Sequence, residues 1–124
     1  MDLLLVGIGG FVGAIARRVV DLWVSDRAGS AFPLGTLVIN VSGAFLVGLL
    51  FAWAMERNVL PREIRGPVMI GFLGAYTTFS TWMLESWRLV EDGAWALAAF
   101  NLAGSVALGL VAVVAGLAVG RLLP

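Results

Sequence analysis

A stretch of glycine, hydroxyl and aromatic residues interrupts the third apolar run of this chain, at Gly71-Phe-Leu-Gly-Ala-Tyr-Thr-Thr-Phe-Ser-Thr81. Glycine weakens the interior of a helix, and main-chain groups without hydrogen-bond partners are costly in hydrocarbon. Irregular backbone at that depth is tolerated only where protein buries it or a water-filled cavity receives it. The stretch therefore predicts a broken helix near the middle of a membrane, where polar groups contact something other than lipid. Such an arrangement is typical of transport proteins.

Composition places the chain among integral membrane proteins. Hydrophobic residues make up 60% of the 124 residues and charged residues only 13%, against about 25% charged residues in a soluble domain. A membrane-spanning helix needs roughly 20 apolar residues. We therefore expect one all-α membrane domain over residues 1–124, with spans at about 3–24, 34–55, 64–89 and 94–119 and the break in the third. We expect no soluble domain and no nucleic-acid partner.

The sequence contains no cysteine and no histidine. Disulfides, thiolate metal sites and the usual proton relay and general base are therefore absent. The sequence also lacks the Gly-x-x-x-x-Gly-Lys motif of nucleotide-binding loops and any pairing of carboxylates for acid–base chemistry. We expect no enzymatic activity.

All eight basic residues are arginines, and they divide evenly between the two sides that four spans create. The positive-inside rule orients a membrane protein by the difference in basic residues between its sides, and here that difference is zero. Either other features orient the chain, or copies insert in both directions and pair as inverted partners, the interpretation that we favour. Inverted repeats place substrate sites near the midplane of many transporters. We expect an antiparallel, dual-topology homodimer.

Polar pairs with helical i,i+4 spacing lie inside two of the spans. Thr36 and Asn40 share a face of the second span, and Asn101 and Ser105 share a face of the fourth. Such residues either hold helices together or line a pathway. For Asn40 we favour the pathway, whereas for Asn101 and Ser105 both roles are equally compatible with the pattern.

Phe79 and Trp82 are i,i+3 neighbours just after the expected break. Aromatic pairs are usually core filling, but the positive edge of a ring favours an anion without a formal charge. The span interiors contain no lysine, so a small anion passing here would be held by amide, hydroxyl and ring-edge donors. Weak sites of this kind suit conduction, which needs both entry and exit.

Charged and main-chain groups near the break complete the candidate site. Glu85 lies one turn beyond Thr81, where Arg17 or Arg18 could pair with it. A broken helix also exposes carbonyls, which coordinate hard cations in some transporters.

Together these segments resemble the Fluc (CrcB) family of fluoride channels over essentially the whole chain. The resemblance rests on three motifs in order, which are Gly9-Gly10-Phe-Val-Gly13 with Arg17, Gly35-Thr-Leu-Val-Ile-Asn-Val-Ser-Gly43, and Gly71–Thr81 with Glu85. It implies passive, fluoride-selective export through two pores along the interface of an antiparallel homodimer. It also implies a multi-pass protein of the bacterial plasma (inner) membrane.

The resemblance further implies roles for individual residues. A structural sodium ion at the dimer centre would be held by the main-chain carbonyls of Gly74 and Thr77. Asn40 matches the pore asparagine, and Phe79 and Trp82 stand at the positions of two pore phenylalanines. The polar track for fluoride would include Ser80, Thr81, Ser105 and Asn101, and the positions matched as structural are Arg17, Gly71 and Glu85.

Two alternatives differ in function class. A small dual-topology exporter of cationic compounds, driven by protons, has the same size and charge balance but needs a carboxylate embedded in the membrane. Residues 3–16 of the first span contain no acid, and Glu85 lies near the end of the third. A non-conducting membrane assembly subunit would use its polar residues only to hold helices together.

Overall fold

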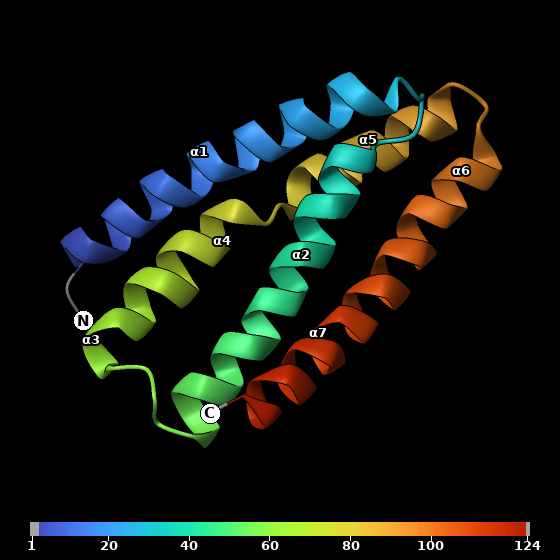
Figure 1. Cartoon of the computed structure of the whole chain (residues 1–124). Helices are drawn as coiled ribbons and strands as arrows, with labels where there is room; N and C mark the ends of the chain where they lie inside the picture. Colours follow the sequence, from blue (N-terminus) through green and yellow to red (C-terminus); the bar gives the residue numbers. More distant parts are fainter. Residues whose placement is uncertain (1–2, 124) are drawn as a thin grey trace.

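The computed structural model describes residues 3–123, and over this range it contains helices and no strands. The all-helical fold predicted from composition is thereby confirmed. The chain crosses the bundle four times (Figure 1). In chain order the elements are α1 (Leu3–Ala28), α2 (Leu34–Phe51), η1 (Ala52–Glu56), α3 (Arg62–Arg65), η2 (Gly66–Phe72), α4 (Leu73–Tyr76), α5 (Phe79–Glu91), α6 (Trp95–Ala99), η3 (Phe100–Gly104) and α7 (Ser105–Leu122).

Three continuous helical stretches within residues 3–123 are long and apolar enough to cross a membrane. They are Leu3–Ala28, Leu34–Glu56 and Trp95–Leu122. The remaining crossing consists of α3, η2 and α4, then an interruption, then α5. Because the break divides this crossing into two shorter helices, neither of them is long enough to cross a membrane alone.

The interruption comprises Thr77 and Thr78, both in extended conformations with ψ angles of 157° and 118°. It falls inside the stretch from which we predicted a break, but on its hydroxyl residues and not on its glycines. The side chain of Thr78 then caps α5, because its Oγ1 accepts a hydrogen bond from the Thr81 N–H at 3.4 Å. Threonine at this position provides the acceptor that an exposed helix N-terminus needs.

Glycines allow the crossings to approach closely, as small residues do between membrane helices. A Cβ on Gly71 would collide with the Val6 carbonyl of α1, and one on Gly116 of α7 with the Phe45 carbonyl of α2. The first contact joins α1 to the broken crossing, and the second joins α2 to α7 (Figure 1). Gly71 therefore acts in packing, several residues before the interruption itself.

The outer face of α1 is apolar and uncovered. Ile8, Phe11, Ile15 and Val19 recur every three or four residues and are 49–69% exposed. Such a stripe is expected to face hydrocarbon in a protein that spans a membrane. At one end of the bundle Arg121 donates two hydrogen bonds to the Glu56 carboxylate, at 2.7 and 2.8 Å, which ties the end of α7 to the end of η1.

Candidate functional site

Asn40 connects the middle of α2 to the interruption. Its Nδ2 donates to the Thr78 carbonyl at 2.9 Å, and its Oδ1 accepts from the Thr78 N–H at 2.8 Å. The side chain thus replaces hydrogen bonds that the Thr78 main chain would otherwise make within a helix. Asn40 holds the break open in a defined shape, because its amide carries a donor and an acceptor on separate atoms.

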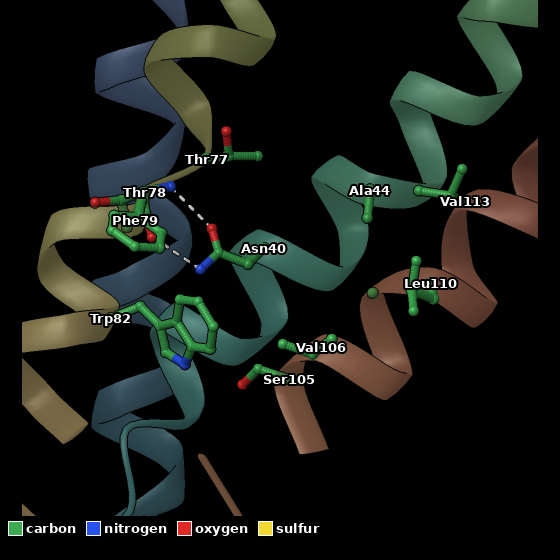
Figure 2. A pocket seen from close by; sticks show the side chains of 11 residues that line it. Asn40, Ala44, Thr77, Thr78, Phe79, Trp82, Ser105, Val106, Leu110 and Val113 are labelled. Carbon is green, nitrogen blue, oxygen red and sulfur yellow. Dashed lines mark hydrogen bonds between the residues drawn. The ribbon is translucent and has the colours of Figure 1, made fainter. Parts of the chain in front are cut away.

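A groove of about 370 Å³ runs beside this contact (Figure 2). Asn40 lines it from α2, Thr77 and Thr78 from the break, Phe79 and Trp82 from α5, and Ser105 from α7. Apolar side chains such as Val106 and Leu110 continue the wall along α7. None of the described residues that line the groove carries a charge. The groove therefore combines amide, hydroxyl and aromatic groups in an otherwise apolar wall.

The aromatic pair expected after the break forms part of this groove. Phe79 and Trp82 lie with their ring centroids 5.7 Å apart and their planes at 74°, an edge-to-face arrangement. Phe79 is 69% exposed, so its ring lies at the surface of the protomer instead of filling a core. An exposed ring at the edge of the groove is placed to contact a ligand, a partner or lipid.

Asn101 lies behind the groove instead of lining it. It is fully buried, and its Nδ2 donates to Ser86 Oγ at 2.9 Å while its main-chain carbonyl accepts from the Trp82 indole N–H at 2.8 Å. Ser105 Oγ donates to Asn101 Oδ1 at 3.5 Å. The i,i+4 pair is thus divided, with Ser105 in the groove wall and Asn101 in the packing between helices.

Ser80 and Thr81 are both exposed, but neither lines the groove. Thr81 Oγ1 accepts from Thr78 Oγ1 at 3.0 Å. Thr81 also borders a second cavity, of about 290 Å³, on the α1 side of the break. Arg17, Asp21 and Thr36 line this cavity as well. Arg17 therefore faces a polar hollow and not lipid.

Glu85 pairs with a hydroxyl and not with an arginine. Thr36, which is buried, donates from Oγ1 to Glu85 Oε1 at 2.9 Å. Glu85 Oε2 is buried and has no hydrogen-bond partner among the described residues. Arg18 instead pairs with Asp21 at 3.3 Å. The pairing of Glu85 with Arg17 or Arg18 that the sequence allowed is not formed within residues 3–123.

The carbonyls of Gly74 and Thr77 lose their usual helical donors at the break. In a continuous helix they would accept from the N–H groups of Thr78 and Thr81. Those groups donate instead to Asn40 Oδ1 and to Thr78 Oγ1. Gly74 is exposed, and a Cβ built on it would meet no atom within 4 Å. Carbonyl oxygens without donors are the ligands that a hard cation accepts.

The family model described as "CrcB-like protein, Camphor Resistance (CrcB)" matches residues 4–117 of this chain. The chain belongs to the CrcB family. A relative from Magnetococcus marinus, named fluoride-specific ion channel FluC, is 44% identical over 123 residues, which cover 99% of this chain and all of that protein. Another of the same name, from Trichormus variabilis, is 42% identical over 118 residues, covering 94% of this chain and 86% of the relative.

Two hydroxyl residues of this CrcB chain were not singled out from the sequence. Ser86 accepts from Asn101 and donates to the Trp82 carbonyl at 2.8 Å. Ser42 lies 2.8 Å from the Tyr76 hydroxyl, next to the break. Both lie inside apolar crossings, and Ser86 is four residues after Trp82. A search for every hydroxyl residue within the spans would have found them, although it would not have named their partners.

Proposed function

We propose that the protein is a channel for passive export of fluoride across the bacterial plasma membrane. The observation that carries the proposal is the uncharged groove beside the helix break, with Asn40, Ser105 and the edge-to-face aromatic pair in its wall. Relatives that match nearly the full chain are named fluoride-specific ion channels. Fluoride enters cells as neutral hydrofluoric acid, dissociates there, and needs only a selective pathway to leave down its gradient.

Neutral donors would hold the ion along the groove. An amide nitrogen has two hydrogens, and Asn40 uses one of them on the Thr78 carbonyl. The second hydrogen and the positive edge of the Phe79 ring are then the groups suited to an anion. The Ser105 hydroxyl would join them by giving up its long, 3.5 Å hydrogen bond to Asn101 Oδ1. Without a cationic side chain in the wall, binding stays weak enough for the ion to leave, as conduction requires.

A second copy of the chain would cover the exposed side of the break. Gly74, Phe79 and Ser80 are exposed on a single protomer, and irregular backbone at membrane depth is stable only when protein or water covers it. The even division of arginines supports an antiparallel partner inserted in the opposite direction. Each protomer would contribute one groove, giving two pores per homodimer.

The freed carbonyls at the break fit a structural sodium ion. Gly74 and Thr77 of each protomer would supply main-chain oxygens, which suit a hard monovalent cation and bring no negative charge of their own. When bound, the ion would add positive charge at the dimer centre and stabilise the extended backbone. The exposed Gly74, with free space above its Cα, allows a partner's main chain to approach.

A proton-coupled exporter is disfavoured because the embedded carboxylate does not line the groove. Glu85 is bound by Thr36 behind the break.

An experiment distinguishes a fluoride channel from a non-conducting assembly subunit. Liposomes loaded with fluoride or with chloride are prepared with the purified protein, and release is followed with ion-selective electrodes.

We expect rapid fluoride release, little chloride release, and loss of fluoride release in Phe79→Ile, which removes the ring edge. Val111→Leu is the matched control, because Val111 of α7 is 67% exposed, and this variant is expected to behave like the parent protein. The proposal would be contradicted if folded protein released fluoride no faster than protein-free liposomes do.

A further inference from the structure

The indole of Trp82 is held in place from outside the groove. Its Nε1–H donates to the main-chain carbonyl of Asn101 at 2.8 Å. Asn101 lies in η3, where a π-helical turn interrupts the i→i+4 ladder between α6 and α7. Figure 2 shows the indole nitrogen on the side of the ring that faces Ser105, away from Asn40. The polar tip of the side chain is therefore turned towards the helix of Asn101.

A buried network fixes this acceptor relative to α5. Asn101 Nδ2 donates to Ser86 Oγ at 2.9 Å, and Ser86 Oγ donates to the Trp82 carbonyl at 2.8 Å. Both Ser86 and Asn101 are buried. Trp82 and Asn101 are thus connected in two ways. The indole of Trp82 donates directly to the Asn101 carbonyl, and the Trp82 carbonyl is connected to the Asn101 side chain through Ser86.

This hydrogen bonding decides which surface of Trp82 is available to an ion in the groove. A hydrogen bond already made to a carbonyl removes the indole N–H as a donor, since that group has a single hydrogen. The carbon surfaces of the ring remain, and the ring packs edge-to-face with Phe79. A locked indole is also bulkier than a single six-membered ring, so it narrows the groove without offering a polar bond.

We propose that Trp82 is the width-setting residue of the groove, locked by the Asn101 carbonyl, and that it discriminates fluoride from larger anions by size and not by donating its N–H. Asn101 and Ser86 are then positioning residues of this ring. The inference rests on the proposed function for the passage of ions, whereas the lock is a property of the folded protein with or without ions.

The lock is tested by NMR on protein labelled with ¹⁵N at its five tryptophans. Trp82→Phe removes one indole signal and so assigns it. We expect the Trp82 indole proton to exchange with D₂O much more slowly than that of Trp87, which is 58% exposed near the end of α5. We also expect its shift to stay unchanged on addition of sodium fluoride. Fast exchange, or a large downfield shift caused by fluoride, would overturn the lock.

The width is tested by anion release from liposomes. We expect Trp82→Phe to raise the chloride-to-fluoride release ratio by roughly tenfold, a typical effect of removing bulk from a fitted pocket. Trp87→Phe, on the same helix but outside the groove, is the control and is expected to keep the parent ratio. Size-exclusion profiles check that both variants are folded.

The outcomes separate this proposal from the proposed function. A parent that releases fluoride, together with an unchanged ratio in Trp82→Phe, overturns the width-setting role alone. A parent that releases no fluoride defeats the proposed function and the width-setting role together, and the exchange experiment then still decides the lock.

Discussion

Gly43 of α2 faces Thr77 so closely that no side chain fits between them. A Cβ on Gly43 would collide with the Thr77 methyl group Cγ2 and would lie 3.4 Å from the Tyr76 ring. Thr77 cannot turn its methyl group away without cost, because its Oγ1 donates to the Leu73 carbonyl at 3.0 Å. A glycine of α2 is thus placed against the first residue of the break, three positions after Asn40.

We therefore expect Gly43→Ala to destabilise the protein by about 1–3 kcal/mol, the usual cost of overpacking. The measurement is the thermal unfolding of purified protein in detergent. Gly7→Ala on the exposed side of α1 is the control, because a Cβ there meets no atom within 4 Å.

Thr77→Ser removes the obstructing methyl group and keeps the hydroxyl. In the Gly43→Ala background it is expected to recover most of the lost stability. Equal losses for Gly43→Ala with and without Thr77→Ser would show that this contact is not the cause.

The sequence predicted the broken crossing because glycines and hydroxyl residues are costly inside an apolar span. It placed the break before Phe79, but it did not say which residues would leave the helix. The interruption fell on Thr77 and Thr78 because the partner that stabilises extended backbone there is Asn40, 38 positions earlier in the chain. Gly71, which weakens helices by propensity, lies instead against α1. Tertiary packing decided between positions that propensity treats alike.

Side-chain partners were less predictable than side-chain locations. Asn40 lines the groove, and so does Ser105, for which the sequence left packing and pathway equally open. Asn101 has the same polar character, yet it is fully buried and bound to Ser86. The indole N–H of Trp82 also looks available in the sequence but is bound to a carbonyl. Every residue has a main-chain carbonyl, so the sequence does not show which carbonyl a side chain will bind. Only the folded structure shows such contacts.

Thr36 provides the only hydrogen bond that the described residues make to the Glu85 carboxylate, from Oγ1 to Oε1 at 2.9 Å. Thr36→Val keeps the shape of the side chain but removes the donor. We expect a loss of about 1–3 kcal/mol in unfolding free energy, because a buried acceptor is left without a partner. Denaturation in detergent measures this loss.

Thr36→Ser is the matched control, because it keeps the hydroxyl and removes only a methyl group. If both variants lose the same stability, packing of the methyl group and not the hydrogen bond explains the effect.

Gly116 of α7 is expected to be intolerant of any side chain. A Cβ there would collide with the Phe45 carbonyl and approach the Leu49 nitrogen to 2.9 Å, and neither main-chain atom can move without shifting α2. We expect Gly116→Ala to lower unfolding stability by about 1–3 kcal/mol. Gly109→Ala on the same helix meets no atom within 4 Å and should be at least as stable as the parent protein, because alanine favours a helix over glycine. A similar loss in both would indicate a general effect of alanine in α7.

Asn40→Asp separates the two roles of the amide at the break. The aspartate could still accept from the Thr78 N–H, but it has no hydrogen for the Thr78 carbonyl, so two acceptors would face each other where a 2.9 Å hydrogen bond now stands. It would also place a negative charge in the wall of the groove. At about 4 Å such a charge repels an anion by roughly 4 kcal/mol near a protein surface.

We therefore expect fluoride release by Asn40→Asp to fall by roughly a hundredfold or more, and unfolding stability to fall by about 1–3 kcal/mol. Asn40→Ser loses both hydrogen bonds to Thr78 without adding a charge, so its stability should fall at least as much while its fluoride release falls less. Liposome release and detergent unfolding are measured on both variants at the same pH. If Asn40→Asp released fluoride as fast as the parent, the groove beside Asn40 could not be the path of the ion. If Asn40→Ser stopped release as completely as Asn40→Asp, the shape of the break, and not charge in the groove, would control conduction.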